Sequence, residues 1–335
     1  MENTKRKTYS QVWPAYNQAQ TNEKARFQEL LFELCQNIED LPRKAGAGRN
    51  RLPLKDMIFC AVFKIYSTVS GRRFISNLRE AQRREFIGKT PHFNSIFNYL
   101  ELEEMTDCLK QLIVESSLPL KSVETEFAVD SSGFSTGQFV RWFDVKYGNT
   151  EDWHDWIKLH LMCGVRTHIV TSVEISGRYA HDSPYFKPLV NATAASGFNL
   201  HEVSADKAYS SRPNLRLVEK HGGTPYIAFK DNARGDSKCK VWNKMFHYYS
   251  LHRDEYMQHY HKRSNSESTF SMIKAKFGER IKSKTAISQT NEALCKILCH
   301  NLCCVVQSIY ELGIEPDFWT ENRPLNGCTN NLDDV

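Results

Sequence analysis

The chain has 335 residues, of which 41% are hydrophobic and 25% are charged, a composition typical of a globular protein with two or three domains. No uninterrupted apolar run reaches the ~18 residues that a membrane-spanning helix needs, and the first residues lack the apolar segment of a secretory signal. We therefore expect no membrane association. Ten cysteines without regular spacing indicate reduced thiols and exclude a secreted disulfide scaffold.

Positive charge is concentrated in the first part of the chain. Residues 1–100 contain 17 lysines and arginines against 9 acidic residues, whereas the net charge of the whole chain is only +5. This distribution favours a polyanionic partner such as nucleic acid. A solvated basic surface is the alternative interpretation.

Four helices are predicted in this basic region. Apolar residues at helical spacing predict a helix over 23–41, and further helices are expected over 54–68, over 72–86, and from Thr90-Pro91 to Leu102. Several arginines lie in the third of these helices: Arg72, Arg73, Arg79, Arg83 and Arg84. We expect an all-helical, helix-turn-helix-like DNA-binding domain over 1–100 and a connecting helix or linker over 101–123. A small helical bundle with no DNA-binding function would show the same pattern.

The hydrophobic pattern changes from residue 124 onward. Short apolar runs predict strands over 126–129, 158–165, 168–175, 200–205 and 224–229, and longer amphipathic stretches predict helices over 182–196, 213–221, 263–277 and 291–312. This order predicts an α/β fold over 124–312, a ribonuclease H-like mixed sheet flanked by helices. Residues 313–335 are polar and acidic and are predicted to form a tail.

Two aspartates follow strands that could be neighbours in this sheet. Asp130 ends the first predicted strand, and Asp206 comes directly after the fourth. Phosphodiester cleavage by two divalent metal ions requires carboxylate oxygens that converge from separate elements, so a third carboxylate must come from a helix. Taken singly the evidence is weak, because an aspartate before Ser-Ser-Gly is also common in turns.

The segment YHKRSNSESTFSMIK contains a candidate for the third carboxylate. Four of its residues would lie within one stripe of about 60° if the segment formed one continuous helix. These residues are Tyr260, Arg263, Glu267 and Lys274. A carboxylate beside two cations and a phenol could bind a metal ion next to DNA phosphates. Alternatively, Ser264 to Glu267 form a capping box, and the helix begins near Ser264. The spacing leaves both interpretations open.

At this point the sequence resembles a known family. The spacing Tyr-x2-Arg-x3-Glu-x6-Lys is similar to the signature of bacterial insertion-sequence transposases of the DDE type, and all four positions match. FAVDSSGFST resembles the first aspartate motif of that family, and VSADKAYSS resembles the second, with Ala208 where glycine is usual. HDSPYFKPLV resembles the segment that precedes the first core helix. The resemblance covers about 124–312.

The resemblance implies a DNA transposase of the cut-and-paste type, an enzyme that hydrolyses DNA at transposon ends and transfers the strands to target DNA. It implies that two Mg2+ ions, or Mn2+ in their place, are held by Asp130, Asp206 and Glu267. It further implies phosphate contacts from Tyr260, Arg263 and Lys274. The implied partners are double-stranded DNA, as terminal inverted repeats and target, and a second copy of the chain in a synaptic homodimer. The implied location is the prokaryotic cytoplasm, at the nucleoid.

The resemblance also implies an insertion before the glutamate helix, which is small here, at about 231–258. Trp242 within it is a candidate for stacking on an extruded base, with a buried packing role as the alternative.

Other residues have simpler interpretations. Asp182 is interpreted as a helix cap, and Asp144, Asp152 and Asp155 are further acidic residues of the same region. The cysteines spaced four apart are interpreted as core residues rather than zinc ligands: Cys295, Cys299 and Cys303. Two other functions remain open, namely a catalytically inactive DNA-binding protein derived from a transposase, and a ribonuclease H-like nuclease without strand transfer.

Overall fold

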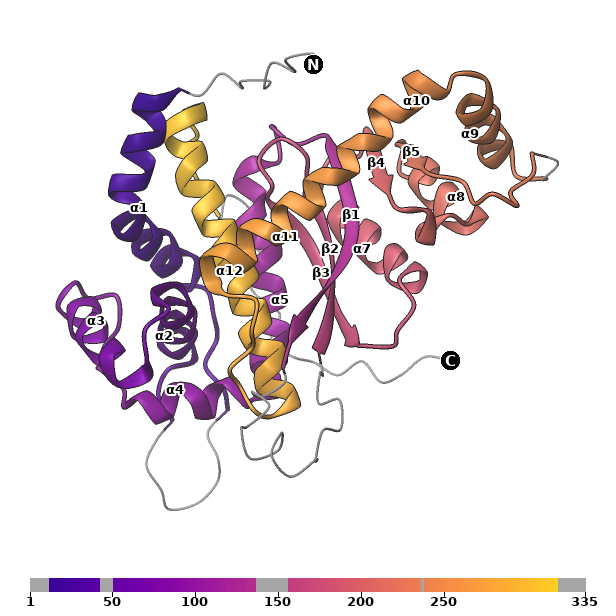
Figure 1. The fold of residues 1–335 in the computed structure, drawn as a ribbon. Helices are drawn as coiled ribbons and strands as arrows, with labels where there is room; N and C mark the ends of the chain where they lie inside the picture. Colours follow the sequence, from indigo (N-terminus) through magenta and orange to yellow (C-terminus); the bar gives the residue numbers. More distant parts are fainter. Residues whose placement is uncertain (1–11, 43–50, 137–155, 236–237, 319–335) are drawn as a thin grey trace, which may run out of the picture.

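The computed structural model describes residues 12–42, 51–136, 156–235 and 238–318 (Figure 1). Three acidic residues of the predicted catalytic region lie outside the described residues: Asp144, Asp152 and Asp155. Residues 319–335, most of the predicted tail, also lie outside them.

The N-terminal part is helical, as predicted. Its elements are α1 (Trp13–Leu34), α2 (Leu54–Ser67), α3 (Gly71–Arg83), α4 (Phe93–Leu100), α5 (Glu103–Ser117) and a short 3-10 helix, η1 (Leu118–Leu120). The first helix begins earlier than predicted because a proline in its first turn is compatible with a helix start. The fourth begins at Phe93, with the His92 side chain accepting from the Asn94 amide, so the expected Thr90-Pro91 cap is wrong. The Thr90 hydroxyl instead lies 2.6 Å from Gln82 Oε1.

A five-stranded mixed sheet forms the centre of the molecule. Its strands are β1 (Glu126–Ser135), β2 (Trp156–Gly164), β3 (Val170–Gly177), β4 (Glu202–Ala205) and β5 (Thr224–Ile227), in the spatial order β3-β2-β1-β4-β5. The first three strands are antiparallel neighbours, whereas β4 and β5 run parallel to β1. The crossovers to the parallel strands contain α7 (Ser183–Ala195) and α8 (Arg212–Lys220). This arrangement confirms the predicted ribonuclease H-like α/β fold.

The remaining helices follow the last strand. They are α9 (Lys240–Leu251), α10 (Arg253–Tyr260), a 3-10 turn η3 (His261–Arg263), α11 (Ser264–Phe277) and α12 (Ala286–Leu312). Figure 1 shows α10 continuing through this turn into α11, which then passes diagonally across the sheet. The 3-10 turn contacts both β1 and β4, and α11 contacts β1 and β2. The glutamate helix therefore packs on β1 and β2, and the 3-10 turn before it packs on β1 and β4.

The sheet has a hydrophobic core on each face. Alternate residues of β1 enter different cores: Ala128 and Phe134 pack with α5, α11, α12 and the N-terminal helices, whereas Phe127 and Val129 pack with α7, α8, α9 and α10. The first core is continuous from the N-terminal helices to the catalytic sheet, because α12 packs against α1, α2 and α5.

Within the described residues, α12 has the length and composition of a membrane-spanning helix, but 78% of its most apolar stretch is buried inside the protein. Its cysteines Cys295 and Cys299 are fully buried, as predicted, whereas Cys303 is partly exposed.

Candidate active site

The parallel pairing of β1 with β4 brings the two predicted aspartates together. Val129 is opposite Ala205 in the last pair of this ladder, so Asp130 and Asp206 are the next residues on neighbouring strands. However, β1 does not end there. It continues to Ser135 as the antiparallel partner of β2, with Asp130 opposite Leu161. Asp130 therefore lies within a strand, and the expectation of a strand end or a turn at this residue is wrong.

Asp206 ends the β4 segment and begins the 3-10 turn over Lys207–Tyr209. Its Oδ1 accepts a hydrogen bond of 2.7 Å from the Lys207 amide, which fixes the carboxylate at the edge of the sheet. Asp130 Oδ1 is held in the same manner by the Ser131 amide, at 2.8 Å. In each case the backbone holds one oxygen, and the other oxygen carries no backbone contact.

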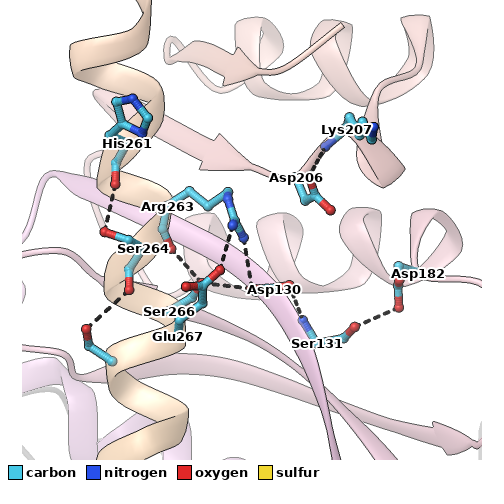
Figure 2. Close-up of polar contacts among 11 residues, drawn as sticks. Asp130, Ser131, Asp182, Asp206, Lys207, His261, Arg263, Ser264, Ser266 and Glu267 are labelled. Atoms are coloured by element: carbon cyan, nitrogen blue, oxygen red, sulfur yellow. Dashed lines mark hydrogen bonds and ion pairs between the residues drawn. The ribbon is translucent and has the colours of Figure 1, made fainter. Parts of the chain in front are cut away.

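Glu267 lies in the first turn of α11 and reaches this site through Arg263 (Figure 2). The Arg263 guanidinium donates to Asp130 Oδ2 at 3.3 Å and to Glu267 Oε1 at 2.5 Å. The Ser266 hydroxyl, on the same helix, also lies 3.3 Å from Asp130 Oδ2. Two elements distant in sequence are therefore joined directly at Asp130.

The capping box does not form, although α11 begins at Ser264, as that alternative expected. The Ser264 hydroxyl donates to the His261 carbonyl rather than capping α11, and Glu267 pairs with Arg263. The helix needs no such cap because the chain enters it from α10 through the 3-10 turn, whose carbonyls accept the first backbone bonds.

The four signature residues lie along this continuous α10–α11 segment. Tyr260 ends α10, and its hydroxyl pKa is raised by burial, opposed by the charge of Arg263 and reinforced by that of Asp206. Lys274 lies farther along α11, 3.3 Å from Glu279 Oε1 and over the ring of Phe134. The charge of Asp206 thus acts on the aromatic hydroxyl, and the lysine lies about two turns along the helix from Glu267.

An open groove of about 520 Å³ runs beside these residues. Its lining includes Asp130, Ser131, Ser132, Glu267, Lys274 and Glu279. The groove leaves the carboxylates accessible to an extended substrate, with a cation on its wall.

The electrostatics of Asp130 are set mainly by its burial. Burial raises the pKa of its carboxyl, and the charge of Asp206 raises it further, against the lowering effect of the Ser131 amide, Arg263 and Ser266. A raised pKa means that the ionised form lacks enough compensation in the protein alone. A bound cation would supply that compensation.

The three carboxylates nevertheless do not form a closed cage as they stand. Among the described histidines, cysteines and acidic residues, no three side chains gather closely enough to hold a metal ion. The Arg263 guanidinium occupies the space between Asp130 and Glu267. The donor set, carboxylate oxygens from two strands and a helix, is the type that Mg2+ or Mn2+ prefers, so the residues fit such an ion once this side chain moves.

A second polar cluster adjoins Asp130 on the opposite face of β1, and the sequence did not predict it. The Ser131 hydroxyl donates to Asp182 Oδ1 at 2.8 Å, and Lys158 Nζ lies 2.6 Å from the same oxygen. Asp182 precedes α7, but its side chain makes no capping hydrogen bond, so its interpretation as a cap is wrong. The alternation of side chains along a strand was the available signal, because it places Ser131 opposite to Asp130.

Tyr209 connects this cluster to the second aspartate. The residue is 1% exposed, and its hydroxyl pKa is raised above its usual range by burial and then by the charges of Asp182, Asp130 and Asp206. The acidic residues behind the site therefore act electrostatically on a phenol that is buried from solvent.

Trp242 lies in α9 and is 7% exposed. Its indole nitrogen donates to the Arg234 carbonyl at 2.7 Å, its ring meets Phe229 edge-on, and the Arg212 guanidinium lies over it. It packs in the second core, and its edge lines a pocket with Arg212, Lys230 and Arg234. Stacking on a base stays a prediction that would require this packing to open.

Comparison with known families places the site in context. A family model described as "Transposase DDE domain" matches residues 121–302. The matched range contains Asp130, Asp206 and Glu267, together with Tyr260, Arg263 and Lys274. No curated protein and no solved structure matches the chain.

Proposed function

The chain belongs to the family of transposases with a DDE domain, and on this premise we propose that it cuts a transposable element out of DNA and joins the freed ends to target DNA. The observation that carries the proposal is the placement of the three carboxylates: Asp130 and the residue after β4, Asp206, lie on neighbouring strands, and Arg263 joins Asp130 to Glu267 of α11. We assign these three carboxylates as the ligands of two Mg2+ ions, with Mn2+ as a substitute.

The metal ions, when bound, would activate the attacking water or 3′-hydroxyl and stabilise the leaving oxygen. The residues of the chain contribute binding and orientation. Ser266 and the Ser131 amide hold Asp130 in place. Arg263, whose planar fork suits phosphate, and Lys274, a point charge on the groove wall, would bind the DNA backbone near the cleaved bond. Tyr260 would add a hydroxyl contact beside Asp206.

We propose that residues 1–100 recognise the element's terminal repeats. The turn between α2 and α3 is short, with Thr68 in the left-handed region. Phe74 and Leu78 bury one face of α3, and its other face exposes Arg72, Arg73, Arg79 and Arg83. This is the pattern of a helix that contacts the phosphates and base edges of a DNA groove.

The remaining organisation is also proposed. Residues 101–123, which include α5, connect the recognition helices to the catalytic region over 124–312, with an insertion about 231–258 that holds α9 and most of α10. Two DNA ends must be handled together, which favours a homodimer in the synaptic complex. DNA as substrate favours the prokaryotic cytoplasm, at the nucleoid, as the site of action.

A DNA cleavage and joining assay tests the proposal. The full chain is incubated with Mg2+, a labelled duplex taken from the DNA that flanks its coding region, and a supercoiled target plasmid. We expect cleaved ends with free 3′-hydroxyls, followed by covalent joining to the plasmid. Binding without cleavage would indicate an inactive DNA-binding protein, and cleavage without joined product would indicate a nuclease without strand transfer. Glu267→Ala serves as the inactive control.

A further inference from the structure

Arg263 makes a double contact at the centre of the candidate site. It is the last residue of the 3-10 turn, and its guanidinium pairs with Asp130 Oδ2 and with Glu267 Oε1 at the same time (Figure 2). Its side chain is 23% exposed, Asp130 is 18% exposed and Glu267 is 56% exposed. Asp130 and Glu267 line the groove, and the contact that Arg263 makes with them is only partly screened by water.

These two carboxylates are the ones that the proposed function assigns to a metal ion. Among the described residues, Arg263 is also the one basic side chain that forms an ion pair with either of them. Three acids and one arginine leave a formal excess of two negative charges, which becomes three once the arginine leaves, so the site favours divalent cations. The site is therefore built to accept a cation and already contains one.

We propose that Arg263 is an internal counter-cation: it pairs with Asp130 and Glu267 in the absence of metal and competes with divalent metal for their oxygens. This inference rests on the proposed function, since it concerns the same carboxylates. The guanidinium lies between these two carboxylates, and among the described residues no three acidic, histidine or cysteine side chains lie close enough to hold a metal ion. Metal entry requires the arginine to leave.

The structure provides a route for this movement. Arg263 lies at the junction of α10 and α11, so its long side chain can rotate about its own bonds without moving either helix. The Ser266 hydroxyl and the Ser131 amide stay on Asp130 and keep its carboxylate oriented. A DNA phosphate in the groove that Asp130 and Glu267 line is the partner that the proposed function provides for the displaced guanidinium. Metal and DNA would then favour each other's binding at this site.

Titration of Mn2+ tests this competition without any reaction being measured. The full chain, without DNA, is titrated with Mn2+, and the free ion is measured by electron paramagnetic resonance. We expect Arg263→Ala and Arg263→Gln to bind Mn2+ about tenfold more tightly than the unmodified chain, because a partly buried ion pair of this type no longer has to be broken. The Mn2+ affinity of Arg263→Lys, which keeps the charge but not the planar guanidinium, should lie between that of the unmodified chain and that of the two neutral variants.

Lys207→Ala is the matched control. Lys207 is exposed beside Asp206, and its backbone amide, which alanine retains, makes the contact to that carboxylate. The variant thus removes one positive charge near the site without breaking an ion pair with the triad, and we expect its affinity for Mn2+ to change by less than about threefold. Circular dichroism of each variant verifies the fold.

The outcomes separate this inference from the proposed function. One outcome would overturn the competition and leave the metal site standing. In that outcome Glu267→Ala weakens Mn2+ binding, but neither Arg263→Ala nor Arg263→Gln tightens it beyond the Lys207→Ala control. Absence of Mn2+ binding in the unmodified chain and in both neutral Arg263 variants overturns the metal assignment and the competition with it.

Discussion

Lys262 links the 3-10 turn before α11 to the sheet by ion pairs, and its replacement is expected to lower the free energy of unfolding. Its ammonium lies 2.7 Å from Glu126 Oε1, at the start of β1, and 2.8 Å from Glu202 Oε2, at the start of β4. Glu202 is only 7% exposed and also contacts His259 Nδ1 at 2.9 Å. One lysine therefore joins the 3-10 turn before α11 to the two strands that lead to Asp130 and Asp206.

The magnitude follows from the burial of the three partners. Exposed ion pairs contribute about 0–1 kcal/mol, and loss of one partner from a fully buried pair costs about 3–5 kcal/mol. The side chains of Lys262 and Glu126 are 27% and 35% exposed, whereas that of Glu202 is 9% exposed. We therefore expect Lys262→Met, which keeps the aliphatic stem, to lower the free energy of unfolding by about 2 kcal/mol.

Urea denaturation at pH 7, followed by circular dichroism, measures this loss. Lys110→Met is the matched control, because Lys110 forms one half-exposed bridge of 2.7 Å to Glu174, away from the catalytic helix. It should cost less than about 1 kcal/mol. A Lys262→Met loss below about 0.5 kcal/mol, or one equal to that of the control, would refute the argument that this lysine anchors the turn.

Three further predictions concern stability and DNA binding. Burial would raise the pKa of Glu202, but hydrogen bonds from Lys262 and His259 outweigh it and hold this pKa below its usual 4.5. The ionised form of Glu202 therefore stabilises the fold above pH 4.5, and this contribution is lost as the pH falls through the lowered pKa. Urea denaturation at a series of pH values should show this loss in the unmodified chain and not in Glu202→Gln. Asn301→Ala should cost about 3 kcal/mol in thermal denaturation, because it leaves the buried amide and carbonyl of Val170 unpaired; a loss under about 1 kcal/mol would contradict this. Lys274→Ala should reduce the salt dependence of DNA binding by about one unit of slope in fluorescence anisotropy titrations, and an unchanged slope would remove it from the phosphate contacts.

The order of strands and helices could be predicted from the sequence because it is local information. The apolar runs gave the five strands in the correct order, and the change in hydrophobic period marked the beginning of the sheet. The proximity of Asp130 and Asp206 along the strand ladder was also predictable, because both come directly after the stretches of β1 and β4 that pair in parallel. The helical spacing from Tyr260 to Lys274 placed Glu267 on the correct element.

The errors arose where distant segments decide the outcome. Asp130 lies within β1 because the antiparallel pairing with β2 continues to Ser135, beyond the end of the parallel pairing with β4. The Ser264 capping box does not form because α10 continues into α11. Asp182 makes contacts across the sheet instead of capping its own helix. In each case a tertiary contact replaced a local preference that was plausible by itself.

The bridge formed by Arg263 is the feature that the sequence could least reveal. The spacing placed arginine and glutamate four residues apart, which predicts a pair within the helix. It did not indicate that the guanidinium also reaches Asp130, far away in the chain. The charge balance of the site depends on this contact.

The most direct test of the account is a crystal structure of the chain grown with Mn2+ and a DNA duplex, analysed by anomalous scattering. The account predicts manganese peaks bounded by Asp130, Asp206 and Glu267, with the Arg263 guanidinium turned from these carboxylates to a DNA phosphate. Manganese bound elsewhere, or three carboxylates that stay apart in the presence of both Mn2+ and DNA, would contradict it.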